Sequence, residues 1–190
     1  YTISAKDMAK RAGHKSAVLW FTGLSGAGKS TLANAVNKRL FDMGLRTFAL
    51  DGDNIRHGLN SDLKFDEESR HENIRRISEV AKLFMQSGTI VTVAFISPFQ
   101  ADREKARKII SEGFFEIFID TPLDLCKKRD RKGLYKKALR GELKNFTGID
   151  SPYEEPLNPD ISIETSQLTV EESVDQVIAL LLEKDIINAE

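Results

Sequence analysis

The feature that most constrains this chain is one octapeptide, Gly23-Leu24-Ser25-Gly26-Ala27-Gly28-Lys29-Ser30. It satisfies the pattern G-x-x-x-x-G-K-[ST] at every fixed position, and this pattern binds nucleotide phosphates where it joins a strand to a helix. The neighbouring residues provide that context, because an apolar run at 17–22 precedes the octapeptide and an Ala-rich helical segment at 30–40 follows it. The motif therefore predicts an α/β fold with a phosphate site where the first strand ends.

Each fixed position of the motif has a chemical reason. Glycines allow backbone N–H groups to turn inward around phosphate oxygens. Lys29 brings a positive charge to the β- and γ-phosphates, and the Ser30 hydroxyl can hold Mg²⁺. The helix that follows points its N-terminus at the anion. We therefore expect residues 23–31, Thr31 included, to bind ATP and Mg²⁺, and Lys29 to act in catalysis.

Short apolar runs alternate with helical patterns along the rest of the chain, which indicates parallel strands joined by crossover helices. Thr169 and Glu172 have the spacing of a capping box, which opens a last helix through Leu182. We predict a single domain over residues 1–190, with a central parallel sheet of about five strands and helices on both faces. The predicted strands are 17–22, 47–50, 89–95, 114–119 and 161–163, and the other predicted helices are 30–40, 72–86 and 102–110.

One stretch, residues 127–159, breaks this rhythm. It contains no predicted strand and is rich in Lys, Arg, Gly and Pro. A long insertion of this kind in a compact domain usually has a function. We therefore expect a mobile basic lid over the active site, whose positive charges repel one another until an anion binds.

The overall charge and composition restrict the partners and the compartment. The formal net charge is −1, so nothing global favours nucleic acid or an anionic membrane. No apolar run approaches the length of a membrane span, and the N-terminal residues are unlike a signal peptide. The single cysteine, Cys126, cannot form an internal disulfide, which suits a reducing compartment. We expect a cytoplasmic protein that binds neither nucleic acid nor membrane.

Two carboxylates, Asp51 and Asp53, flank a glycine just beyond the second predicted strand. In open parallel sheets ligands bind beyond the carboxyl ends of the strands, so both side chains can face the phosphate loop. One carboxylate could orient Mg²⁺ through water while the other accepts a proton from an attacking hydroxyl. The alternative is a local turn initiated by an Asp side chain.

Arginines and aromatic residues outside the predicted elements are further candidates. Arg56 and Arg70 fall in irregular segments, where a role in binding phosphate or sulfate and a solvent-exposed role are both open. Phe65 and Phe146 lie in polar stretches, where they could stack on a base or pack into the core.

A GTP switch protein would need a guanine-reading Asn-Lys-x-Asp. Here Asn37-Lys38 lies inside a predicted helix, and Leu40 occupies the Asp position. A small domain with a basic lid instead favours a small-molecule phosphotransferase.

Five blocks of the sequence resemble adenylylsulfate kinases. They are residues 20–31, 51–60, 72–76, 95–98, and 132–138 with 146–154. Many kinases share the first block, whereas the second and fifth are far more specific. The resemblance runs from about residue 20 to the last helix, and it implies a P-loop kinase fold.

In that family the γ-phosphoryl group of ATP is transferred to the 3′-hydroxyl of adenylyl sulfate, in sulfate assimilation. The resemblance implies that Asp53 is the catalytic base and that Ser97 matches a serine sometimes assigned as a phosphoserine intermediate. In-line transfer needs no such intermediate, so a structural serine before Pro98 is the alternative. The resemblance also implies a homodimer. Predicted substrate contacts are Asp53, Arg56, Phe65, Arg70, Asn73, Ile96, Ser97, Lys132 and Phe146, and Arg129 is predicted to contact the nucleotide.

Two other functions remain open. The chain could be a kinase for another small alcohol, or an inactive regulatory domain fused to or associated with an ATP sulfurylase. The intact residues Gly28, Lys29, Ser30 and Asp53 favour an active enzyme.

Overall fold

The computed structural model describes residues 2–188, with the side chain of Asp53 outside the described part. Within these residues, five parallel strands form one sheet in the order β2-β3-β1-β4-β5. This confirms the predicted fold class. The strands are β1 (Ala17–Thr22), β2 (Thr47–Asp51), β3 (Ile90–Ala94), β4 (Phe114–Asp120) and β5 (Ile161–Glu164).

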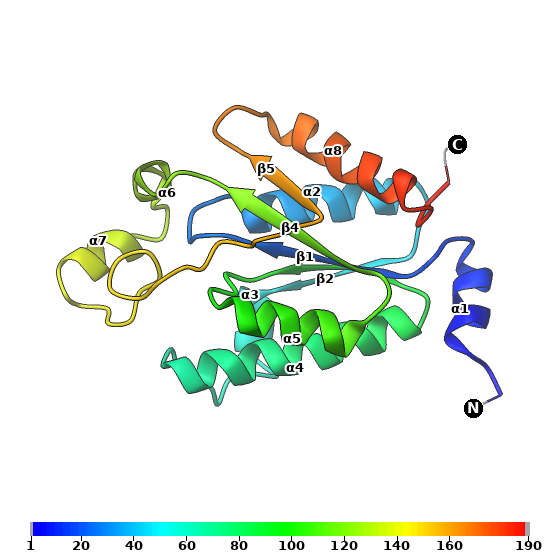
Figure 1. Ribbon diagram of the computed structural model, residues 1–190, viewed down its shortest axis with the longest axis horizontal. Helices are drawn as coiled ribbons and strands as arrows, with labels where there is room; N and C mark the ends of the chain where they lie inside the picture. The colour runs from blue at the N-terminus through cyan, green and yellow to red at the C-terminus, as the bar shows by residue number, and fades with distance from the viewer. Residues whose placement is uncertain (1, 189–190) are drawn as a thin grey trace.

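Helices cover both faces of the sheet (Figure 1). On one face lie α2 (Lys29–Asp42) and α8 (Val170–Glu183), and on the other lie α4 (Glu67–Gln86) and α5 (Gln100–Ile110). The central strand β1 is buried along its whole length, and its side chains alternate between the two layers. Leu19 and Phe21 pack with α2 and α8, whereas Val18 and Trp20 pack with α4 and α5. An apolar strand without polar alternation is therefore what this position requires.

Several helical segments differ from the predictions. The structure adds α1 (Ala5–Ala12) and α3 (Gly52–Arg56), and it starts α4 five residues earlier than predicted. Asp66 caps α4 by accepting a hydrogen bond from the Ser69 backbone N–H, and two glutamates in the first turn favour the helix dipole. Arg56 and Arg70 therefore lie on helices, and the prediction that they fall in irregular segments is wrong.

The predicted lid begins inside a helix. Residues 127–129 end α6 (Leu123–Arg129), and α7 (Leu134–Leu139) follows within the lid. No strand of the sheet falls among residues 127–159, as expected for this described stretch. In Figure 1, α6, α7 and the loop after them lie together at one end of the molecule, beyond the carboxyl end of β4.

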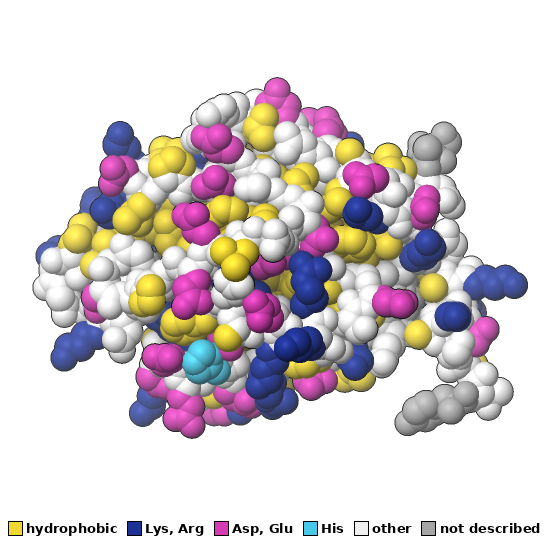
Figure 2. All heavy atoms as spheres, viewed as in Figure 1, with side chains coloured by type: hydrophobic (Ala, Val, Ile, Leu, Met, Phe, Trp, Pro, Cys, Tyr) yellow, Lys and Arg dark blue, Asp and Glu magenta, His cyan; other side chains and the backbone are white. Residues whose placement is uncertain are grey.

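Two features bear on the surface. Acidic and basic side chains are interspersed over the face that Figure 2 shows, in keeping with the formal net charge of −1. None of the helices within residues 2–188 is both long and apolar enough to cross a membrane.

The capping box of α8 should contribute measurably to stability. The Thr169 hydroxyl accepts a hydrogen bond from the Glu172 N–H, and the Glu172 carboxylate accepts one from the Thr169 N–H. Because α8 buries Val174, Val177 and Leu181, Thr169→Ala should lower the free energy of unfolding by about 1 kcal/mol in urea titrations.

The matched control is Ser4→Ala, which removes the same kind of box from α1. That helix buries no residue, so its fraying should leave global unfolding almost unchanged. Equal effects of the two substitutions would contradict this assignment of stability to α8.

Candidate functional site

The segment from Gly23 to Ser30 turns sharply between β1 and α2, and the turn needs glycine. Gly26 has φ +76°, and a Cβ atom there would lie 2.9 Å from the Cys126 carbonyl oxygen. At Gly23 a Cβ atom would lie 2.7 Å from the carbonyl oxygen of Ile119. Both contacts are with backbone atoms that cannot easily move, so the loop is held directly against β4 and α6.

Lys29, the first residue of α2, is buried beside this loop. Its Nζ donates a hydrogen bond of 2.7 Å to the Leu24 carbonyl, which folds the side chain back over the turn. Burial lowers the pKa of Lys29 to about 8, against the opposing influence of Cys126 and Asp51. The ammonium group is thus held where phosphate oxygens would bind, in an environment that favours an added negative charge.

Polar contacts from the lid side support the same loop. Arg129, at the end of α6, donates to the Ala27 carbonyl at 3.2 Å and to Thr165 at 3.0 and 2.9 Å. Tyr135, on α7, donates from its hydroxyl to the Ser25 carbonyl at 2.9 Å. The structure therefore places Arg129 next to the phosphate loop, and its contact with the nucleotide stays a prediction.

A cavity of about 290 Å³ opens beside the N-terminal turn of α2. Its polar lining comes from Ser30, Asn34, Asp51 and Thr92, and the rest is mostly alanine. The Thr92 hydroxyl is buried and has no hydrogen-bond partner among the described residues. Hydroxyl, amide and carboxylate oxygens are the donors that hydrated Mg²⁺ prefers, so this group of residues fits a magnesium site.

The side chain of Asn54 makes two hydrogen bonds at the turn after β2. Asn54 accepts a hydrogen bond from the Asp51 N–H at 3.0 Å and donates to the Ala49 carbonyl at 3.2 Å. Asn54 thus closes the turn after β2. Asp53 is the second residue of α3, and its side chain lies outside the described residues.

Three of the predicted substrate residues lie together on α3, α4 and the segment between them. The Arg56 guanidinium lies 4.3 Å from the centre of the exposed Phe65 ring. Arg70 donates to the Phe65 carbonyl at 3.0 Å. Burial lowers the pKa of Arg56, and the nearby Arg70 lowers it further, so two cations share this corner.

Arg70 also reaches into the lid. It donates to the Thr147 hydroxyl at 2.9 Å and to the Asn145 carbonyl. Phe146 lies between these two residues, half-buried, with its ring edge-to-face on Tyr135 at 5.0 Å. The structure thus ties the middle of the lid to α4 and to α7, while Lys132 lies on the turn between α6 and α7.

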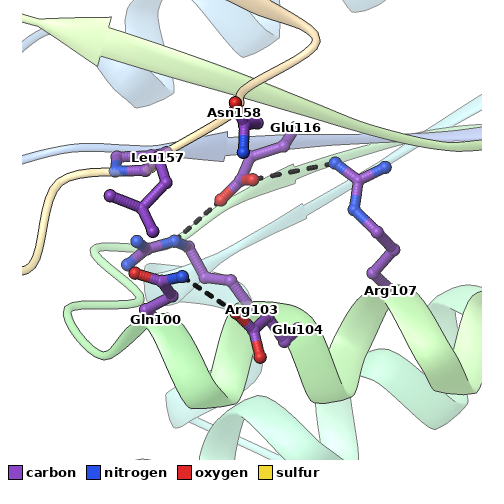
Figure 3. A pocket seen from close by; sticks show the side chains of 8 residues that line it. Gln100, Arg103, Glu104, Arg107, Glu116, Leu157 and Asn158 are labelled. Carbon is purple, nitrogen blue, oxygen red and sulfur yellow. Dashed lines mark hydrogen bonds and ion pairs between the residues drawn. The ribbon is translucent and has the colours of Figure 1, made fainter.

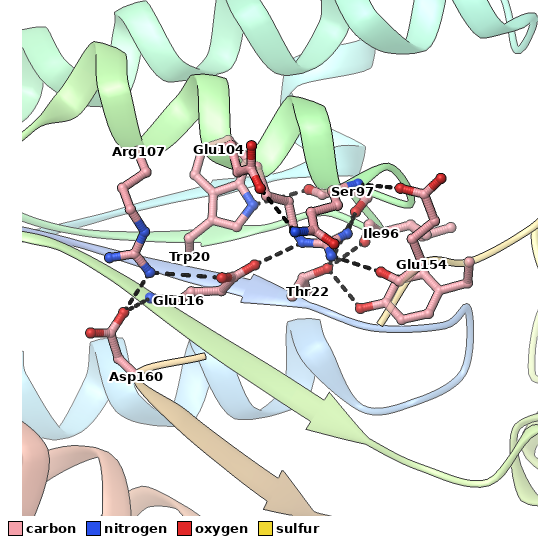
Figure 4. A network of polar contacts seen from close by, with 12 residues as sticks. Trp20, Thr22, Ile96, Ser97, Glu104, Arg107, Glu116, Glu154 and Asp160 are labelled. Carbon is pink, nitrogen blue, oxygen red and sulfur yellow. Dashed lines mark hydrogen bonds and ion pairs between the residues drawn. The ribbon is translucent and has the colours of Figure 1, made fainter. Parts of the chain in front are cut away.

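Asn73 and Ser97 are buried, whereas Ile96 is half-buried. Asn73 is buried on α4 and accepts a hydrogen bond of 2.9 Å from Asn60. The Ile96 carbonyl accepts one of 2.7 Å from Thr22. Ser97 is only 1% exposed, has a φ of +46°, and accepts a hydrogen bond of 3.0 Å from the Trp20 indole (Figure 4). Its hydroxyl is therefore engaged inside the protein.

Sequence reasoning missed Thr92 and Tyr135. Thr92 lies in a strand that reads as continuously apolar, and only the neighbouring small residues leave room beside its hydroxyl. Tyr135 lies in a strongly basic stretch, yet it is one of the largest fully buried side chains. The signal that could have identified Tyr135 is an aromatic residue within a strongly basic stretch.

Comparison with known proteins places the chain in a family. The model of the family described as adenylylsulphate kinase matches residues 15–164. The adenylyl-sulfate kinase of Prochlorococcus marinus is 56% identical over 187 residues, which are 98% of this chain and 93% of that protein. The chain belongs to the adenylylsulphate kinase family.

Other relatives of this family agree. The adenylyl-sulfate kinase of Clostridium acetobutylicum is 56% identical over 185 residues, covering 97% of this chain and 92% of that protein. A solved structure of the Mycobacterium tuberculosis APS kinase in complex with AMPPNP and APS has a TM-score of 0.85 at 48% identity, covering 88% of this chain and 98% of that chain. The fold is therefore that of this kinase family.

The lowered pKa of Lys29 predicts proton uptake when ADP binds. At pH 8 about half of the free protein carries a neutral Lys29, and bound phosphates would restore the charge. Calorimetry in buffers of different ionisation enthalpy should show uptake of about half a proton at that pH. ADP affinity should be flat well below pH 8, begin to fall as pH 8 is approached and fall steadily above it, because protonation must then accompany binding.

The control for this measurement is Lys29→Met, which should bind ADP more weakly and without the uptake. Any proton exchange that comes from the nucleotide itself is common to both proteins and cancels in the comparison. Equal uptake in the parent and the variant would assign the titration to another group.

Proposed function

We propose that this protein transfers the γ-phosphoryl group of ATP to the 3′-hydroxyl of adenylyl sulfate, giving ADP and 3′-phosphoadenylyl sulfate. The observation that supports the proposal is that the lid contacts both the phosphate loop and the corner formed by Arg56, Phe65 and Arg70. Tyr135 and Arg129 bond to the phosphate loop, and Arg70 bonds from the Arg56–Phe65 corner to the middle of the lid. Membership of the adenylylsulphate kinase family then supports adenylyl sulfate as the phosphoryl acceptor.

On the nucleotide side, the backbone of residues 23–30 and Lys29 would bind the ATP phosphates. Ser30 would ligate Mg²⁺ directly and Asp51 through water, with the cavity beside Thr92 holding the remaining water molecules. When bound, Mg²⁺ supplies charge neutralisation at the β- and γ-phosphates. Lys29 stabilises the charge that grows on the transferred group and on the leaving oxygen.

On the acceptor side, Arg56 and Arg70 offer planar cations to the phosphate and sulfate oxygens of adenylyl sulfate. Phe65 and Phe146 offer ring faces to adenine, and Lys132 approaches from the lid. Asn73 and Ile96 would also contact adenylyl sulfate. Asp53 accepts the proton of the 3′-hydroxyl as the oxygen attacks, because it follows Asp51 at the carboxyl edge of the sheet.

The assembly and surroundings of the protein are also proposals from the resemblance. We propose a cytoplasmic homodimer that either acts alone or works with an ATP sulfurylase. The alternative functions, an inactive regulatory domain or a kinase for another small alcohol, would leave the intact phosphate loop or the Arg56–Phe65–Arg70 corner without a role.

A coupled ADP-release assay tests the reaction. ADP release from MgATP should require adenylyl sulfate, and AMP or a sugar acid should not replace it. Asp53→Asn should lower turnover by about 10²- to 10⁴-fold, because an amide keeps the shape but accepts no proton. The Michaelis constant for ATP should stay within about twofold of the parent value, because the substitution affects proton transfer and leaves ATP binding unchanged.

Two outcomes would count against this scheme. Release with another acceptor alone would assign a different substrate. Normal turnover by Asp53→Asn, in a protein that requires adenylyl sulfate, would leave the reaction intact and remove Asp53 as the base.

Ser97→Ala should retain substantial turnover, because the buried Ser97 hydroxyl bonds to Trp20. The substitution leaves the indole N–H unpartnered and should cost about 1–3 kcal/mol of unfolding free energy. Incubation of the parent protein with labelled ATP alone should leave it unlabelled. A folded but inactive variant, together with a labelled parent, would establish the phosphoserine intermediate instead.

A further inference from the structure

One arginine on α5 makes three charged hydrogen bonds in the interior. Arg103 is 2% exposed, and its guanidinium donates to the Glu116 carboxylate, the Ser97 carbonyl and the Glu154 carbonyl, each at 2.7 Å. Figure 3 shows the bond to Glu116. Burying an arginine is costly unless its donors are satisfied. These three acceptors come from β4, from the loop after β3 and from the end of the lid, so one side chain holds three separate segments together.

The end of the lid and the loop after β3 are also bonded to each other. The Glu154 N–H donates to the Pro98 carbonyl at 2.9 Å, and the Glu154 carboxylate accepts from the Gln100 N–H at 2.7 Å. Tyr153 shares a hydrogen bond of 2.9 Å with Thr22, which itself donates to the Ile96 carbonyl. Burial raises the pKa of Tyr153 to about 12, so its hydroxyl keeps its proton.

The loop held in this way carries backbone strain. Ser97 has a φ of +46°, which is unfavourable for a residue with a side chain, and such conformations persist where the surroundings fix them. Trp20 holds its hydroxyl and Arg103 holds its carbonyl. Loss of the Arg103 contact would allow the loop that contains Ile96 and Ser97 to relax.

We propose that Arg103 is a positioning residue that couples the end of the lid, residues 153–154, to the substrate loop at residues 96–98. Glu116 orients the guanidinium, and the two backbone carbonyls receive its other donors. Arg103 then links movement of the lid at this end to the shape of the substrate loop, alongside the direct bonds between the two segments. The kinetic consequence rests on the proposed function, whereas the coupling itself does not.

Arg107 provides a matched control one helical turn along α5. It approaches the same Glu116 at 3.7 Å (Figure 3), but its shorter contact is to Asp160 at 2.8 Å, just before β5 (Figure 4). Its side chain is 41% exposed, and its hydrogen bonds within the described chain run to Asp160 and to the Phe114 carbonyl. Arg107 therefore shares the helix, the charge and the carboxylate of Arg103 without contacting the loop or the lid end.

Hydrogen exchange of Arg103→Lys and Arg107→Lys, measured without substrate, tests the coupling. A lysine keeps the charge but cannot reach three acceptors with a planar fork. In Arg103→Lys, exchange should rise about tenfold in both 95–100 and 153–156 together, as expected when charged hydrogen bonds are lost. The phosphate loop should be unchanged, and Arg107→Lys should match the parent in all three segments.

Kinetics distinguish positioning from a loss of stability alone. Arg103→Lys should raise the Michaelis constant for adenylyl sulfate about tenfold and that for ATP by less than about twofold. A rise in only one of the two segments, or equal effects of the two lysine substitutions, would overturn the proposal. If hydrogen exchange rises in both segments but the protein does not use adenylyl sulfate, the coupling stands and the proposed function is wrong.

A milder variant covers the case in which Arg103→Lys does not fold. Tyr153→Phe removes only the hydroxyl bond to Thr22, beside the same contact. It should raise exchange in both segments by a smaller factor. Unchanged exchange in both would then contradict the coupling.

Discussion

Parallel pairing of a strand that is buried on both faces is the constraint on which the site depends. β1 lies between β3 and β4, with Phe21 opposite Ala94 and Thr22 opposite Phe118, so the three strands end at one edge. The phosphate loop follows β1, the loop of Ile96 and Ser97 follows β3, and α6 follows β4. Segments far apart in the sequence therefore meet there without any bound partner.

Close backbone packing turns this edge into a phosphate site. The loop after β1 touches the backbone of β4 and α6 at Gly23 and Gly26, and this leaves little space around Lys29. Burial then makes the free ammonium group unfavourable, which is why the pKa of Lys29 falls. The same desolvation strengthens the attraction of Lys29 for a phosphate, so part of the affinity for nucleotide derives from the packing of the loop.

The elements that the sequence predicted well are those with a repeating pattern. The strands, the helices that cover them and the Thr169–Glu172 capping box all follow from local periodicity. The start of α4 was misjudged because Asp66 and two glutamates look like a polar loop until the cap is recognised. Arg103 could not be found at all, because in a charged helix it reads as solvent-facing, and only the tertiary fold places Glu116 and two carbonyls around it.

The lid is attached at both ends and in the middle, to different parts of the site. Its first part contacts the phosphate loop through Tyr135, its middle contacts α4 through Arg70, and its end contacts the loop after β3 through Glu154. If binding at one site changes the affinity of the other through this segment, binding at the second site must change the affinity of the first by the same factor. Under the proposed function, water exclusion during transfer would require no separate gate, because one segment is bonded both to the phosphate loop and to Arg70 at the proposed acceptor site.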